Sequence, residues 1–94
     1  MTQNEAAAKI INHYGAQHQL VKLCEECAEL TQQAAKCYSI GIIPYTADMV
    51  EEMADVKVML MQFESIMHQP DRDLLDQIVT EKLERQLERI ANDD

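Results

Sequence analysis

Residues 23–30 have the sequence LCEECAEL, and this stretch decides how the chain folds. Leu23 and Leu30 lie seven residues apart and enclose Glu26 and Glu29, which is the spacing of residues on one helical face. With only two Gly and two Pro in the chain, long uninterrupted helices are favoured over a turn-rich β fold. We therefore predict a helix over residues 17–39, with a heptad-like apolar repeat of Leu23, Cys27, Leu30, Ala34 and Cys37.

A second acidic stretch, residues 50–56 (VEEMADV), repeats the pattern with Glu52 and Asp55. Residues three apart share one face of a helix, so two such helices packed antiparallel would aim Glu26, Glu29, Glu52 and Asp55 at one point. Four carboxylates repel each other unless a cation holds them. Because the ligands are hard oxygens, Mg²⁺ is the expected metal, with Mn²⁺ as the alternative.

The alternative interpretation of each motif is a solvated helix face, because Glu is a good helix former. Glu26 also lies four residues after Lys22, which suits a surface ion pair. On a helical wheel, however, Glu52 falls inside an apolar stripe and Glu26 at the edge of one. An unpaired carboxylate there costs on the order of several kcal/mol. Two motifs in this position favour a metal site, whereas Glu25 and Glu51 point farther outward.

Three further helices are expected from apolar periodicity and from their end signals. They span residues 2–14, 46–68 and about 71–92, with expected caps at Thr2 (paired with Glu5 in a capping box), Gly15, Gly41, Thr46, and Asp71 or Asp73. The predicted fold class is all-α, an antiparallel four-helix bundle formed by one domain over residues 1–94.

Composition limits the partners. A chain of 94 residues buries a small core, which together with the heptad-like stripes predicts a homodimer or homotetramer. The formal net charge of −9 argues against nucleic acid and against an anionic membrane surface. No signal-peptide pattern or membrane-spanning apolar run is present, so we expect a soluble, cytoplasmic protein. The pair Cys24 and Cys27 is expected to form small buried side chains rather than a redox or zinc site.

The pattern Glu-x-x-Glu, a gap of 22 residues, then Glu-x-x-Asp resembles the MazG-like family. This all-α nucleoside triphosphate pyrophosphohydrolase superfamily also includes dimeric dUTPases and phosphoribosyl-ATP pyrophosphatases. The resemblance runs from residue 19 to residue 90 and is strongest in residues 23–30 and 50–56. Residues 81–87 (EKLERQL) resemble the family's Lys-apolar-x-Arg-Arg segment, except that Gln86 replaces the second Arg.

The resemblance implies cleavage between the α- and β-phosphates of a nucleoside triphosphate, giving a nucleoside monophosphate and pyrophosphate. Mg²⁺ would bridge the acidic quartet and the phosphate oxygens while an activated water attacks phosphorus in line. The residues matched to family roles are Glu26, Glu29, Glu52 and Asp55 as metal ligands, Glu25 and Glu51 as candidate catalytic bases, and Lys82 and Arg85 as phosphate ligands. In the family, the start of the chain can help line the base pocket, where His13, Tyr14, Gln17 and His18 would lie.

Other interpretations stay open. Lys82 and Arg85 could form a solvated helix face, and the residues near His13 and Gln17 could be exposed polar groups. Within the enzyme class, the alternative is a phosphohydrolase dedicated to one nucleotide, dUTPase-like or phosphoribosyl-ATP pyrophosphatase-like. Outside that class, the chain could be a non-catalytic helical interaction module, with its acidic faces at the surface and its last helix as a pairing seam.

Overall fold

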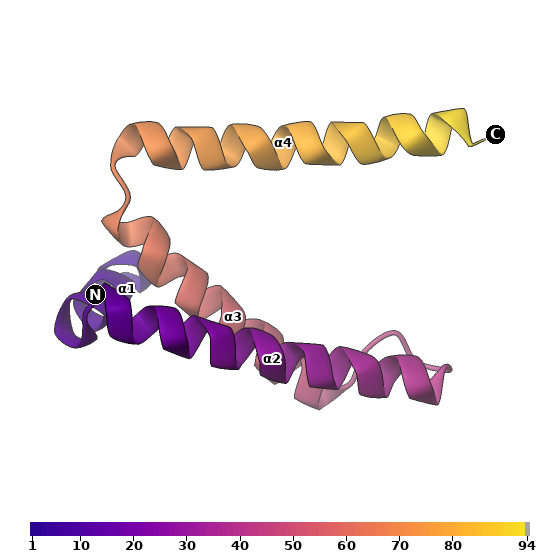
Figure 1. Cartoon of the computed structure of the whole chain (residues 1–94), viewed down its shortest axis with the longest axis horizontal. Coiled ribbons are helices and arrows are strands. Elements are labelled where there is room, and N and C mark those ends of the chain that lie inside the picture. Colours follow the sequence, from indigo (N-terminus) through magenta and orange to yellow (C-terminus); the bar gives the residue numbers. More distant parts are fainter. Residues whose placement is uncertain (94) are drawn as a thin grey trace.

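Four helices joined by short connections make up the structure, a computed structural model that describes residues 1–93 (Figure 1). Helix α1 spans Gln3–Tyr14, α2 spans Ala16–Ile40, α3 spans Ala47–Ile66 and α4 spans Gln69–Asn92. No strand occurs in these 93 residues, so the predicted all-α class is confirmed. None of the described helices combines the length and the apolar character needed to cross a membrane.

The ends of the first three helices follow the predicted caps. The Thr2 hydroxyl accepts a hydrogen bond from the Glu5 backbone N–H at 3.1 Å, and the reciprocal bond completes the capping box. Gly15, with φ of 88°, separates α1 from α2, and Gly41 ends α2 in the left-handed conformation. The Thr46 hydroxyl accepts from the first turn of α3 at 3.1 Å.

The predicted start of the fourth helix is wrong. Helix α4 begins at Gln69, with His68 as N-cap, rather than after a cap at Asp71 or Asp73. Pro70 lies inside the first turn, where its missing N–H would have had no helical partner and its fixed φ suits the helix. Pro70 therefore helps to begin α4, whereas α3 has already ended at Ile66.

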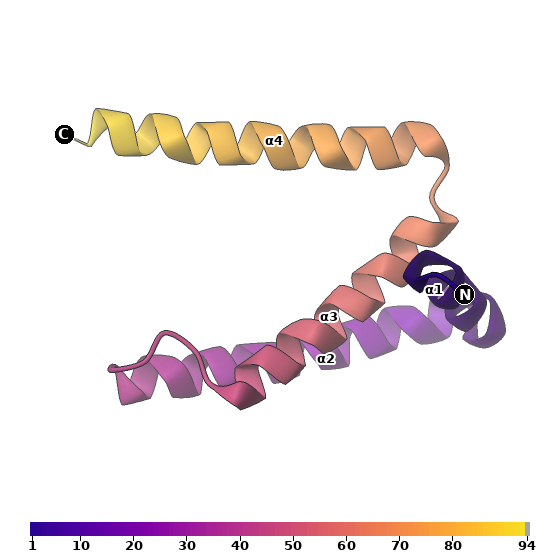
Figure 2. The ribbon, with the colours of Figure 1, turned by 180° about the vertical axis from the view of Figure 1, so that it is seen from behind.

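The packed part of the molecule is formed by α1, α2 and α3. Helices α2 and α3 run antiparallel, and α1 crosses them near the start of α2, mainly against α3 (Figure 2). The buried apolar side chains are few, as expected for a short chain: Ala7, Ile11, Cys37 and Met59. The buried polar pair is Gln19 and Gln62, whose side chains form a 2.8 Å hydrogen bond between α2 and α3.

Helix α4 is set apart from this unit. It turns away from the end of α3 and runs roughly along the direction of α2, separated from the packed helices, and none of its described residues is buried (Figure 1). The described chain therefore contains a packed three-helix unit and a fourth helix whose apolar residues are exposed except for Leu75, which is partly covered.

The two central cysteines differ from the prediction. Cys24 and Cys27 are exposed, and only Cys37 is buried. The reason is that α3 covers the neighbouring side of α2, where Leu23 and Glu26 lie, and leaves the side that carries Cys24 and Cys27 open. The expectation that both thiols are buried is wrong.

Candidate metal centre

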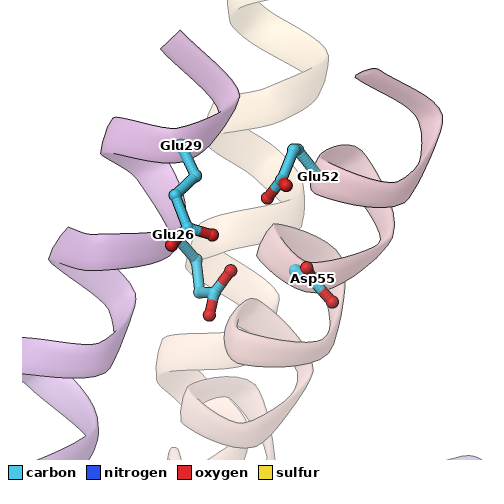
Figure 3. Close-up of side chains that lie close together, drawn as sticks. All are labelled: Glu26, Glu29, Glu52 and Asp55. Carbon is cyan, nitrogen blue, oxygen red and sulfur yellow. The ribbon is translucent and has the colours of Figure 1, made fainter. Parts of the chain in front are cut away.

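Four carboxylates meet between α2 and α3, as the sequence pattern predicted. Glu26 and Glu29 come from α2, and Glu52 and Asp55 come from α3 (Figure 3). One carboxylate oxygen from each residue lies within 4.8 Å of the others. We call these four residues the carboxylate cluster.

The register of the α2–α3 pair explains why the cluster forms. The hydrogen bond between Gln19 and Gln62 places these two residues opposite each other. Seven residues onward along α2 is Glu26, and seven residues back along α3 is Asp55. The next helical turn places Glu29 opposite Glu52 in the same way. Each acidic motif therefore lies seven to ten residues from the glutamine on its own helix. Because the two helices are antiparallel, the motifs meet.

Burial divides the cluster into an inner and an outer half. Glu26 is 8% exposed and Glu52 is half-buried, whereas Glu29 and Asp55 are exposed. One oxygen of Glu26 and one of Glu52, Oε2 in each case, are buried and have no hydrogen-bond partner among the described residues. Buried polar atoms without a partner are uncommon in native proteins. The cluster thus has two unsatisfied oxygens inside and an open side toward solvent.

One cation lies next to the cluster. The Lys22 ammonium is 3.4 Å from Glu26 Oε1 and 3.6 Å from Glu25 Oε2. The pKa of Lys22 is raised, chiefly by its hydrogen bond to Glu26. The pKa of Glu26 is nevertheless also raised, because burial and the charges of Glu29 and Asp55 outweigh the attraction of Lys22. A single ammonium does not balance four carboxylates.

The donor set fits a hard divalent cation. All the candidate ligand atoms are carboxylate oxygens, which suit Mg²⁺ or Mn²⁺ better than soft metals. The two buried oxygens without donors are the atoms that a cation would satisfy. The two exposed carboxylates leave one side open for a further ligand.

The other predicted residues lie around the cluster or away from it. Glu25 and Glu51 are exposed, as expected, and Glu25 pairs with Lys22. Lys82 and Arg85 are exposed on α4, where they line a shallow hollow on that helix. Viewed from the carboxylates, α4 passes behind α2 and α3 (Figure 3). Among the described residues, neither Lys82 nor Arg85 forms an ion pair with a carboxylate of the cluster.

A hollow beside the cluster is lined by Tyr14, His18, Gln19, Val21, Lys22 and Glu25. The rings of Tyr14 and His18 stack, with centroids 5.2 Å apart and planes inclined by 17°. The predicted pocket residues His13 and Gln17 are exposed and adjoin this hollow without lining it. Gln19 and Lys22 are site residues that the sequence pattern did not predict, although the spacing of Lys22 from Glu26 was the available signal.

Comparison of the chain with protein-family models, with curated proteins and with solved structures finds no match. The resemblance to the MazG-like family therefore stays a prediction that depends on residues 23–30 and 50–56. The geometry of the carboxylate cluster does not depend on that resemblance.

Proposed function

We propose that the chain is a Mg²⁺-dependent nucleotide pyrophosphohydrolase, which cleaves the α–β phosphate bond of (d)NTPs to a nucleoside monophosphate and pyrophosphate. The observation that carries the proposal is the carboxylate cluster with its two buried, unpartnered oxygens. The reaction type and the nucleotide substrate come from the MazG-like resemblance of the two acidic motifs.

The case for a cation is energetic. A buried carboxylate oxygen without a donor loses hydration and gains nothing in return, so it destabilises the folded state. Glu26, Glu29, Glu52 and Asp55 would hold Mg²⁺, or Mn²⁺, through the oxygens that now face one another. When bound, the cation would supply positive charge next to the phosphate oxygens, where negative charge increases during cleavage.

The outer half of the cluster is the proposed entry side for the triphosphate. Glu29 and Asp55 are exposed there, and Lys22 lies on the same flank of α2 as the hollow. On a chain with a net charge of −9, an anionic substrate needs this local positive charge in order to bind. Glu25 and Glu51, which are exposed near the cluster, are the candidate bases that would take a proton from the attacking water.

The hollow next to Lys22 is the proposed site for the nucleotide base. Its Tyr14 and His18 rings offer stacked aromatic surface, and a planar base would stack on such a surface. His13 and Gln17 adjoin the hollow and remain secondary candidates. The phosphate-binding role of Lys82 and Arg85 rests on the resemblance alone.

The proposal extends to the assembly, the compartment and the substrate range of the enzyme. A homodimer or homotetramer located in the cytoplasm is the proposed assembly and compartment. A narrower substrate range, dUTPase-like or phosphoribosyl-ATP pyrophosphatase-like, is the alternative within the enzyme class.

A non-catalytic helical interaction module is the second candidate. The observation that favours it is the exposed apolar side of α4, which suits a partner helix. In that case the carboxylate cluster would be surface charge, and metal would change neither activity nor stability.

The test is identification of the products from a panel of NTPs and dNTPs, with Mg²⁺ and with EDTA. Metal-dependent release of pyrophosphate is expected from the wild-type chain and from Glu84→Gln, which removes one exposed carboxylate from α4. Glu52→Gln removes one charge from the cluster and should lose at least ~100-fold in kcat/KM. Release of orthophosphate, or equal rates in EDTA, would contradict the proposed reaction.

A further inference from the structure

Four side chains in series connect the contact between α2 and α3 with the hollow beside the carboxylate cluster. The Gln62 amide nitrogen lies 3.5 Å from the Met59 sulfur, and the Gln62 amide oxygen lies 2.8 Å from the amide nitrogen of Gln19. The Gln19 amide oxygen lies 2.7 Å from Nδ1 of His18, whose ring lines the hollow. We call this series, Met59, Gln62, Gln19 and His18, the amide relay.

The three inner members of the relay are shielded from water. Met59 and Gln19 are each 4% exposed, and Gln62 is 2% exposed. Within the described residues, the partners of the Gln62 amide are Met59 and Gln19. Buried polar groups in native proteins are hydrogen-bonded to the neighbours they have. The chemistry of those neighbours therefore decides which way each amide points.

The sulfur of Met59 sets the direction in which the relay donates. A thioether accepts hydrogen bonds and has no hydrogen to donate, so the NH2 group of Gln62 must face it. Gln62 then offers its carbonyl oxygen to Gln19, which donates with its own NH2 group. If both amides were reversed, the Gln62 oxygen would face the sulfur, and neither of these two atoms can donate.

The relay therefore determines which nitrogen of the His18 ring carries the proton. The carbonyl oxygen of Gln19 only accepts, so Nδ1 of His18 must donate to it. A neutral imidazole has one N–H, which leaves a free lone pair on Nε2. The side-chain hydrogen bond of His18 in the described part of the chain uses Nδ1, so Nε2 is available to a ligand.

The hollow into which His18 is built suits a planar ligand. Its volume is about 520 Å³, which is within the range of small-molecule sites. Tyr14 stacks on the His18 ring with 5.2 Å between the centroids. The charged groups that line the hollow, Lys22 and Glu25, are 3.6 Å apart and pair with each other. Nε2 of His18 is thus an uncharged acceptor that the relay holds in one hydrogen-bonding state.

We infer that Nε2 of His18 selects the ligand of this hollow, by accepting a hydrogen bond from an N–H group at the edge of a nucleotide base. The inference rests on the proposed function, which places a base in the hollow. Because the Tyr14 and His18 planes are inclined by 17°, a base in the plane of the His18 ring stays nearly parallel to Tyr14. His18 then touches the base, and the inner members of the relay are positioning residues.

This assignment specifies the class of base that the site accepts. Adenine and cytosine present an amino group at the base edge, and uracil presents a ring N–H. A base in which methyl groups replace these hydrogens has nothing to donate to Nε2 and leaves the lone pair without a partner. The hollow should therefore favour unmodified bases over bases that are alkylated at this edge.

The first measurement is a 15N NMR spectrum of the histidine rings in the full chain at pH 8.5. The protonated and the lone-pair nitrogen of a neutral imidazole differ widely in chemical shift, so the spectrum identifies the tautomer. His18 should be in the Nδ1–H form. His68, whose side chain makes no capping hydrogen bond, is the internal reference for an imidazole outside the relay.

Two variants test whether Met59 controls this tautomer from the other helix. Met59→Leu conserves the side-chain volume but removes the sulfur, so the direction of the relay is no longer set. His18 should then populate the Nε2–H form that free imidazole side chains prefer. The matched control Met61→Leu removes a thioether two residues further along α3 and should keep the Nδ1–H form. Circular dichroism checks that both variants are folded, and the wild-type readouts do not depend on them.

The second measurement adds nucleoside monophosphates to the wild-type chain with Mg²⁺, because the proposed reaction does not cleave them. The probes are AMP, CMP, GMP and UMP. A hydrogen bond to the lone pair moves the Nε2 resonance to lower frequency, and we expect this movement with each nucleotide that binds. The methylated counterparts N6,N6-dimethyl-AMP, N4,N4-dimethyl-CMP and N3-methyl-UMP should leave Nε2 unmoved. They should bind at least ~5-fold more weakly than their parents.

Four results would overturn the inference. The first is an Nε2–H tautomer of His18 in the wild-type chain, and the second is an unchanged tautomer in Met59→Leu. The third is a nucleotide that shifts other resonances in a saturable way and leaves Nε2 unmoved. The fourth is the absence of binding by every probe, which would exclude a nucleotide base as the ligand.

The outcome is separable from that of the proposed reaction. If nucleotides move Nε2 but no pyrophosphate is released from triphosphates, the proposed hydrolysis fails and the role of His18 in base selection stands. If pyrophosphate is released and Nε2 does not respond to nucleotides, the hydrolysis stands and the role of His18 is wrong.

Discussion

Lys22 and Glu26 are held together by an ion pair of 3.4 Å, yet the second carboxylate oxygen of Glu26 is buried without a donor among the described residues. The ion pair therefore satisfies only one of the two oxygens of this carboxylate. The predicted ion pair with Lys22 is confirmed for one oxygen of Glu26, whereas the predicted role of Glu26 as a metal ligand stays a prediction.

Neutralising one member of the cluster should stabilise the metal-free protein. Glu52→Gln keeps the shape of the side chain, removes one charge and adds an amide donor that can reach a neighbouring carboxylate. In EDTA we expect the unfolding free energy to rise by about 1 kcal/mol, or roughly 5 °C in Tm for a domain of this size. Thermal unfolding followed by circular dichroism measures this.

The same variant should lose its response to metal. Millimolar Mg²⁺ is expected to raise the Tm of the wild-type chain and of Glu84→Gln, because a ligand that binds only the folded state stabilises it. Glu52→Gln should show little of this rise. If Mg²⁺ raised the Tm of all three proteins equally, the stabilisation would not come from the cluster.

Acidification should stabilise the metal-free protein over the range in which Glu26 titrates. Its folded-state pKa is raised by burial and by Glu29 and Asp55, so the folded state binds a proton more readily than the unfolded state. The stabilising contribution is therefore complete below the ordinary pKa of Glu and is lost as the pH rises through the raised value.

Urea unfolding in EDTA between pH 4.5 and pH 7.5 tests the sign of this dependence. The unfolding free energy of the wild-type chain should fall as the pH rises, and the slope should be shallower in Glu26→Gln. Glu84→Gln is the control for the general effect of net charge and should keep the wild-type slope. A wild-type stability that increases steadily with pH would contradict the raised pKa of Glu26.

The buried amide pair that sets the register is expected to be the most sensitive polar contact of the core. Gln62 is 2% exposed and accepts a 2.8 Å hydrogen bond from Gln19, which in turn lies 2.7 Å from the His18 ring. Gln62→Leu leaves the amide of Gln19 buried without its partner, so we expect a loss of about 2 kcal/mol.

A double-mutant cycle in urea isolates this contact. The double variant Gln19→Leu/Gln62→Leu should be less destabilised than the sum of the two single variants, because neither amide is then left without a partner. Additive losses would show that the hydrogen bond does not couple the two positions.

The sequence predicted the helices and the cluster well because both depend on local spacing. Caps such as Thr2, Gly41 and Thr46 act within one helical turn, and their structural positions match the prediction. The cluster needed one further assumption, that α2 and α3 are antiparallel neighbours, and chain connectivity makes that arrangement the simplest one.

The sequence did not predict which side of α2 is covered by α1 and α3. The predicted repeat combined residues that the other helices cover at least partly (Leu23, Leu30, Cys37) with exposed residues (Cys27, Ala34). The covered side and the exposed side of α2 are one residue apart in sequence, which is a rotation of only about 100° around the helix. Apolar spacing identifies a side that needs a partner, but it does not say whether that partner belongs to the same chain. For this reason the sequence did not predict that Cys24, Cys27 and the apolar residues of α4 are exposed.

The central claim is that the carboxylate cluster is a divalent-cation site, and a Mn²⁺ titration followed by electron paramagnetic resonance tests it most directly. We predict that the wild-type chain and Glu84→Gln remove free Mn²⁺ from solution at a saturable site, that Mg²⁺ competes for it, and that Glu52→Gln binds at least ~10-fold more weakly. Equal Mn²⁺ binding by the wild-type chain and Glu52→Gln, or no saturable binding by either, would contradict the claim.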